Sequence, residues 1–183
     1  MATSITTEGT IIRDARDRYR RRGEDGAKGA FDAEVRRIGS VPRTEVAVKR
    51  AAAPARVAGL LGIDSATEAA VRDRKMYAGE RRVQLAVTYV PVDVAEAAGI
   101  EQVDTGVGGI ISRMREAGFE QDDAYEELRQ VEVGAEEAEL LGVPAGTSLI
   151  EITHVASSGD RVVEVTVHTL GPGWVLKYGV PLA

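Results

Sequence analysis

The stretch VRDRKMYAGERRVQLAVTYVP, residues Val71–Pro91, decides the fold because it has the pattern of a β-hairpin with its turn at Gly79. The odd positions of the second strand are apolar and are expected to face a core. The even positions place four polar side chains on the opposite face: Arg72, Arg74, Gln84 and Thr88. Two arginines on one rigid strand make a candidate anion site. A solvated strand face with cross-strand polar pairs is the alternative.

The hairpin belongs to an internal repeat. Residues 58–87, shifted by 80, align without a gap on residues 138–167 with nine identities in thirty positions, where roughly two are expected from average composition. The repeated unit contains a short helix ending in Leu-Leu-Gly and a hairpin. The sequence therefore predicts two similar halves that share one antiparallel sheet with helices, which is an α+β fold.

The repeat also predicts a site. The second-half counterparts of the polar positions are again mostly polar, so both halves present the same kind of face. A pocket shared by the halves would be lined by Arg72, Arg74, Gln84, His154, Glu164, Thr166 and His168. Cationic donors beside a carboxylate suit a small ligand that carries an anionic group together with hydroxyls or an amine.

Composition restricts the class of protein. The chain has 183 residues, a net charge of −6 and no cysteine, which excludes disulfides and thiol catalysis and disfavours nucleic-acid binding by the chain as a whole. No apolar run is long enough to span a membrane and no signal peptide opens the chain, so we expect a cytoplasmic protein without a membrane partner.

The chain divides into two parts. Residues 1–30 combine an arginine cluster with acidic residues and glycines and have few core residues, which predicts a linker or arm. Residues 31–183 are expected to form the domain. Its short helices are predicted after Pro54, over residues 92–98, 110–117 and 136–141, and further strands over 44–50, 124–133, 149–156, 162–170 and 174–178.

Two further motifs allow only limited chemistry. Thr105-Gly106-Val107-Gly108-Gly109, just before a predicted helix, offers backbone N–H groups to an anion, although a tight loop that caps the helix explains it equally well. His154 and His168 lie on one hairpin without a triad-like partner, and a zinc site would need further ligands. We therefore expect no catalytic residues, no metal and no cofactor. We expect acidic residues such as Glu126 and Glu136 to form a solvent-exposed face.

The residues from Phe31 to Leu182 resemble the UTRA domain, the effector-binding module of HutC-type regulators in the GntR superfamily. The motifs that carry this resemblance occur in order: Leu60-Leu61-Gly62, Arg72-Asp73-Arg74, Thr88-Tyr89-Val90-Pro91, Thr105–Ile110, Leu140-Leu141-Gly142, Val163-Glu164-Val165 and Trp174-Val175-Leu176. In addition, Glu8–Arg13 resembles the chain that follows a GntR winged-helix domain.

The resemblance implies a chorismate lyase-like fold, a small-molecule effector such as a sugar phosphate, and a homodimeric bacterial transcription factor. By position, Arg72 and Arg74 match the family's paired effector-binding arginines, the loop with Thr105, Gly108, Gly109 and Ile110 matches its anion-holding helix start, and Glu164 matches an acidic pocket residue. Gln84 stands where sensors of amino-sugar phosphates carry a glutamate, which argues against an amino sugar.

The resemblance also has a departure. The winged helix expected before residue 9 is absent, so operator DNA would be reached only through a domain that this chain does not contain. Three functions are open at this point: an effector sensor of a regulator, an enzyme on the chorismate lyase-like fold, and a dimerisation module that binds no ligand.

Overall fold

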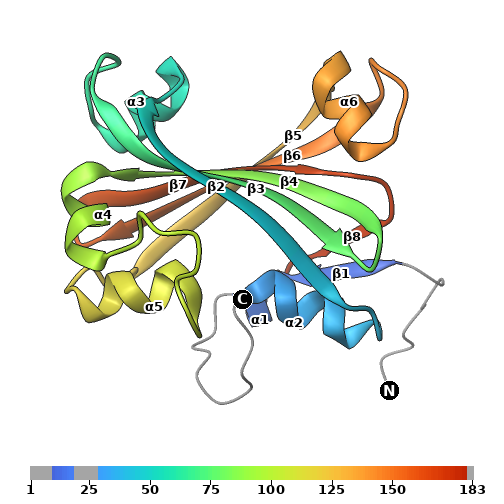
Figure 1. The fold of residues 1–183 in the computed structure, drawn as a ribbon, viewed down its shortest axis with the longest axis horizontal. Helices are drawn as coiled ribbons and strands as arrows, with labels where there is room; N and C mark the ends of the chain where they lie inside the picture. The colour runs from blue at the N-terminus through green and yellow to red at the C-terminus, as the bar shows by residue number, and fades with distance from the viewer. Residues whose placement is uncertain (1–9, 19–28, 181–183) are drawn as a thin grey trace.

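The computed structural model describes residues 10–18 and 29–180. Its centre is a six-stranded antiparallel sheet in the order β2-β3-β4-β7-β6-β5 (Figure 1). The strands of this sheet are β2 (Pro42–Ala52), β3 (Glu68–Ala78), β4 (Arg81–Pro91), β5 (Asp123–Glu132), β6 (Ser148–Ser158) and β7 (Arg161–Leu170). A small parallel sheet pairs β1 (Ile11–Asp14) with β8 (Trp174–Lys177).

Helices lie on both faces of the large sheet. Figure 1 shows α3 (Ala55–Leu61) and α6 (Ala135–Leu141) above it, and α1 (Ala15–Arg18), α2 (Ala30–Arg37) and α5 (Gly109–Glu116) below it. Helix α4 (Val92–Ala98) follows β4 directly and packs against α5. Within the described residues, every helix is too short or too polar to span a lipid bilayer.

The predicted hairpin is confirmed, with β3 and β4 antiparallel around Gly79. Gly79 has a φ of 61°, which a residue with a side chain adopts at a cost. On the upper face, Leu85 of β4 packs into the cluster beneath α6, as expected for an odd position. The even face is also covered, because Arg72, Gln84 and Thr88 are all buried. The alternative of a solvated strand face is therefore wrong.

The internal repeat is visible in the element bounds. Helices α3 and α6 differ by 80 residues at both ends, and so do β3 and β6. Each helix ends at a left-handed glycine, Gly62 with φ 67° and Gly142 with φ 68°. The strand order is consequently two similar three-stranded units, β2-β3-β4 and β5-β6-β7, joined between β4 and β7. This arrangement confirms the α+β fold with two similar halves.

The N-terminal part contains more structure than the sequence indicated. In the segment interpreted as an arm, β1 pairs with β8 and Ile11 is fully buried. Helix α2, which we did not predict, covers part of the lower face, where Phe31 and Val35 pack with Ile11. The residues that follow β1 are thereby brought against the polar face of the sheet. The boundary between arm and domain at residue 30 stays a prediction.

Candidate functional site

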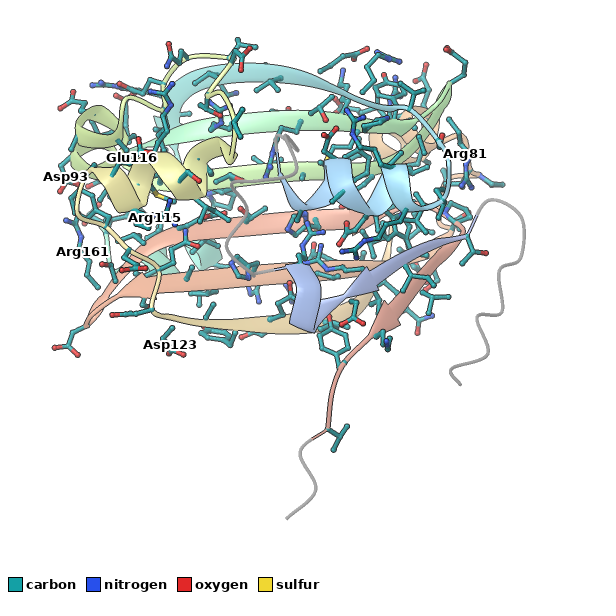
Figure 2. All side chains as sticks on the ribbon, turned by 90° about the horizontal axis from the view of Figure 1, so that it is seen from below. Arg81, Asp93, Arg115, Glu116, Asp123 and Arg161 are labelled. Carbon is teal, nitrogen blue, oxygen red and sulfur yellow. The ribbon has the colours of Figure 1, made fainter. Side chains whose placement is uncertain are left out.

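A cavity of about 570 Å³ lies between the lower face of the sheet and the elements that cover it. Residues of β3 and β7 line it from the sheet, and the starts of α2 and α5 line it from the other side. Figure 2, seen from below, shows α5 and α2 lying one after the other across this face. Arg115 and Glu116 mark the end of α5 that is remote from α2, so α5 begins on the side of α2. The first residues of both helices line the cavity and bring their positive dipole ends to it.

Most of the predicted site residues lie on this cavity wall. The structure brings together the following ones: Arg72, Arg74, Thr105, Gly108, Gly109, Ile110, His154, Glu164, Thr166 and His168. Gln84 and Thr88 are not on the wall, but each is buried directly behind it and hydrogen-bonded to a wall residue. The structure thus brings most of the predicted residues together at one cavity, whereas the assignment of this cavity as a ligand site stays a prediction.

Arg74 begins a hydrogen-bond chain that crosses the two halves. Its Nη2 donates to Thr88 Oγ1 at 2.5 Å, Thr88 contacts Thr166 Oγ1 at 2.6 Å, and Thr166 donates to Glu164 Oε1 at 2.7 Å. Arg74 Nε is buried and has no hydrogen-bond partner in the described part of the chain. Burial, opposed mainly by the charge of Glu164, lowers the pKa of Arg74 to about 10. A buried guanidinium with a spare N–H is suited to bind an anion.

Arg72 has a different environment, although it is only two residues away. Its Nη1 donates to the backbone oxygens of Ile100 and Gln102, both at 2.6 Å, and its Nη2 donates to that of Val103 at 3.1 Å. Burial lowers the pKa of Arg72. These contacts fix the segment that leads into the glycine loop. Arg72 therefore shapes the cavity wall, and its donors are largely used by the protein itself.

The glycine loop keeps only part of the donor capacity that its sequence suggested. The Gly106 N–H donates to Asp104 Oδ1 at 2.9 Å, and the Gly109 N–H donates to the Gly106 oxygen at 3.2 Å. Gly108 precedes α5 with a φ of 78°, which explains the glycine at this turn. Both interpretations of the loop thus have support, since it caps the helix and also faces the cavity.

The two histidines lie on neighbouring strands at the cavity. Burial lowers the pKa of His168 well below its usual value, and the charges of Arg13, Arg18 and Arg74 act in the same direction. Burial also lowers the pKa of His154, against the charges of Glu164 and Glu126. Both imidazoles are therefore neutral near pH 7. Among the described residues, no group of three or more His, Cys, Asp or Glu is arranged to hold a metal.

The sequence interpretation missed two buried ion pairs that join the N-terminal segment to this site. Arg18, which lines the cavity, donates through Nη1 to both carboxylate oxygens of Glu34, at 2.7 and 2.6 Å. Arg13 pairs with Glu126, whose side chain is 7% exposed, so the interpretation of Glu126 as solvated is wrong. Apolar Ile11 beside Arg13, and the helical spacing of Phe31, Glu34 and Val35, were the available signals.

A second hollow of about 480 Å³ lies near the tip of the β3–β4 hairpin and α6. Its wall includes Arg82, whose guanidinium already donates to Tyr77 Oη and to the backbone oxygen of Leu140. Several of its other wall residues, such as Glu80 and Arg81, are exposed. This hollow lacks the buried, partly unpartnered cation that distinguishes the first cavity.

Comparisons with known proteins identify the family of this chain. The model of the UTRA domain matches residues 37–171. The chain belongs to the UTRA domain family. This match confirms the family predicted from the sequence, whose members are effector-sensing domains of transcriptional regulators. A search of curated protein sequences found no match to this chain.

Solved structures show the same fold. PhnF from Mycobacterium smegmatis is 18% identical, with a TM-score of 0.73 over 95% of this UTRA domain chain and 73% of PhnF. The effector domain of PhnF is 18% identical, with a TM-score of 0.69 over 83% and 94% of the two chains. The C-terminal domain of the histidine utilization repressor from Pseudomonas syringae is 16% identical, with a TM-score of 0.66 over 78% and 99%. These neighbours confirm the predicted fold.

Proposed function

We propose that this UTRA domain binds a small anionic metabolite in the cavity beneath the sheet and transmits the binding to a DNA-binding domain of a HutC-type bacterial regulator. The observation that carries the proposal is Arg74 on the cavity wall, whose buried Nε has no hydrogen-bond partner among the residues that the structure describes. Burial disfavours the charged form of this guanidinium, and the charge of Glu164 opposes that effect only in part. An anion bound beside it would compensate for this lost hydration.

The other groups on the wall suggest what else the ligand carries. Glu164 is buried but accepts hydrogen bonds from Thr166 and from Gln121 Nε2, the latter at 2.7 Å. Its charge is therefore already partly satisfied, which favours ligand hydroxyls over a second formal cation. A sugar phosphate or a hydroxylated carboxylic acid has this combination of groups. We expect binding without turnover.

The N-terminal segment supplies a route for the signal. Arg18 belongs to α1, which follows β1, and it lies on the cavity wall while it pairs with Glu34 of α2. A ligand anion would compete with Glu34 for this arginine, and the competition would change the position of α1 relative to α2. We propose that a homodimer in the cytoplasm converts this change into an altered spacing of its DNA-binding domains on the operator.

A binding experiment with a matched control tests this function. Thermal-shift screening of anionic metabolites should find a ligand that stabilises the chain, and calorimetry should give its affinity. The variant Arg74→Met should weaken that affinity about tenfold or more, because a charge-assisted hydrogen bond is worth about 1.5–3 kcal/mol.

Arg129→Met is the control, since Arg129 is an exposed arginine on β5 that pairs with Glu151. It should leave the affinity unchanged. Equal affinities for wild type and Arg74→Met would contradict the site, and steady turnover of the ligand would favour an enzyme.

A further inference from the structure

Gln84 is a fully buried amide behind the cavity wall. Its Nε2 lies 2.9 Å from His168 Nδ1 and 3.2 Å from the sulfur of Met76. In this orientation the amide NH₂ faces the imidazole and donates to it. The opposite orientation would place Oε1 beside Nδ1 and turn the NH₂ group away from both of its partners, whereas in the present orientation Oε1 is the amide atom without a partner in the described part of the chain.

This contact determines where His168 carries its proton. Nδ1 accepts a hydrogen bond from the amide, so it cannot itself be protonated, and a neutral imidazole must then carry its proton on Nε2. An imidazolium would direct a second N–H against the amide donor, so the same contact opposes protonation of the ring. The low pKa of His168, which burial mainly causes, is consistent with the neutral ring.

The protonated nitrogen is available to the cavity. His168 lines the cavity, and its Nε2 has no hydrogen-bond partner among the residues that the structure describes. Strand pairing places Arg74, Ala86 and His168 in one row across β3, β4 and β7. With neighbouring strands about 4.8 Å apart, the backbones of Arg74 and His168 are roughly 10 Å apart, and only the small side chain of Ala86 lies between them.

We propose that Gln84 is a positioning residue that fixes His168 as an Nε2–H donor, so that the cavity presents a hydrogen-bond donor opposite Arg74 and selects ligands with an acceptor oxygen on that side. The second half of this proposal rests on the proposed function, and the first half does not. A glutamate at position 84 would accept from Nδ1–H and leave Nε2 as an acceptor. Residue 84 would then decide between ligands with an oxygen and ligands with an amine at this point.

The tautomer can be measured without any ligand. The chain has only two histidines, so long-range ¹H–¹⁵N spectra contain two imidazoles, and His154→Gln identifies them. In the wild type, His168 should show a protonated Nε2 and an unprotonated Nδ1. Gln84→Glu should reverse this pattern, whereas Gln130→Glu, at an exposed glutamine on β5, should leave it unchanged.

A second variant guards against loss of folding in Gln84→Glu. Gln84→Met has a similar volume and no donor, so it should give a mixture of both tautomers. A protonated Nδ1 in the wild type, or a wild-type pattern in Gln84→Met, would overturn the proposal.

Inorganic phosphate tests the ligand side separately. Added to the wild type, it should shift the His168 Nε2 resonance, and the shift should be lost in Arg74→Met. If the tautomer is as proposed but phosphate leaves this resonance unchanged, the ligand selection by His168 is wrong while the positioning by Gln84 stands. If phosphate binds and shifts only resonances elsewhere, the proposed site itself fails.

Discussion

Arg72 and Arg74 occupy equivalent positions on one face of one strand, but the structure gives them different partners. The sequence placed both on the cavity face correctly, because strand periodicity fixes the side of the sheet. It could not show that Arg72 donates to three backbone oxygens about thirty residues further along the chain. Such contacts depend on the path of a loop, which no local pattern encodes.

We predict that Arg72→Met destabilises the fold more than it affects the anion contact itself. Its removal leaves the oxygens of Ile100 and Gln102 without their donor, and a buried unsatisfied polar group costs about 1–3 kcal/mol. Urea unfolding should show this loss, while the exposed control Arg129→Met should stay within about 0.5 kcal/mol of the wild type. A wild-type midpoint for Arg72→Met would contradict the structural role.

The buried histidines predict an acid-sensitive fold. Burial holds the pKa of His168 below its unfolded value of about 6.5. In mild acid this histidine is therefore protonated in the unfolded chain but still neutral in the folded chain. The contribution of His168 to the free energy of unfolding is therefore complete above about pH 6.5. Below that pH the free energy of unfolding falls by up to about 1.4 kcal/mol per pH unit because of this group. Unfolding free energies measured between about pH 7.5 and 5.5 give the slope.

His168→Gln should reduce that slope. His154→Gln should reduce it less, because Glu164 and Glu126 favour the protonated form of His154. If His168→Gln has the same slope as the wild type, the neutral buried histidine is not the cause.

At the scale of elements, the internal repeat could be predicted from the sequence because both halves contain the same local signals. A helix that ends at a glycine and a hairpin around a glycine occur twice at the same spacing, and each signal depends only on nearby residues. Helix α2 and strand β1 were missed although local signals were present, such as the helical spacing of Phe31 and Val35 and the left-handed Gly39 just after α2. Arg18, which belongs to an arginine-rich run, looked like part of a solvated arm, and only its pairing with buried Glu34 shows otherwise.

The symmetry of the repeat makes a quantitative prediction for its glycines. Gly62 and Gly142 end α3 and α6 in the left-handed region at nearly equal φ, and neither has a heavy atom near the position of an added Cβ. Alanine at either site should therefore cost only backbone strain, about 1–2 kcal/mol, and the two losses should be equal. Denaturant midpoints measure both.

Gly59→Ala is the matched control for this pair. Gly59 lies inside α3 with space around it and without a positive φ, so alanine there should raise stability by about 0.5–1 kcal/mol. Unequal losses at Gly62 and Gly142 would show that the two halves differ in stability despite their common pattern.

For the whole molecule, the N-terminal segment connects the cavity to whatever precedes it in a regulator. Strand β1 is held through Arg13 and Glu126, and α1 is held through Arg18 and Glu34, so two buried ion pairs determine where this segment leaves the domain. Arg18 also lines the cavity, so we expect a bound anion to compete with Glu34 for it. The position of the N-terminal segment should therefore differ between the ligand-free and the ligand-bound domain.

We predict that the chain is a homodimer whose N-terminal segments move when an anionic ligand binds. The chain has no cysteine, so a single cysteine introduced at Ala15, the first residue of α1, labels each protomer once. Electron–electron distance measurements should give a different distance with and without saturating ligand, whereas labels at Glu80, on the remote β3–β4 turn, should give an unchanged distance. Glu34→Gln, which weakens the hold on Arg18, should shift the ligand-free distance toward the bound one. Sedimentation as a monomer at micromolar concentration, or a label distance at Ala15 that ignores the ligand, would contradict this coupling.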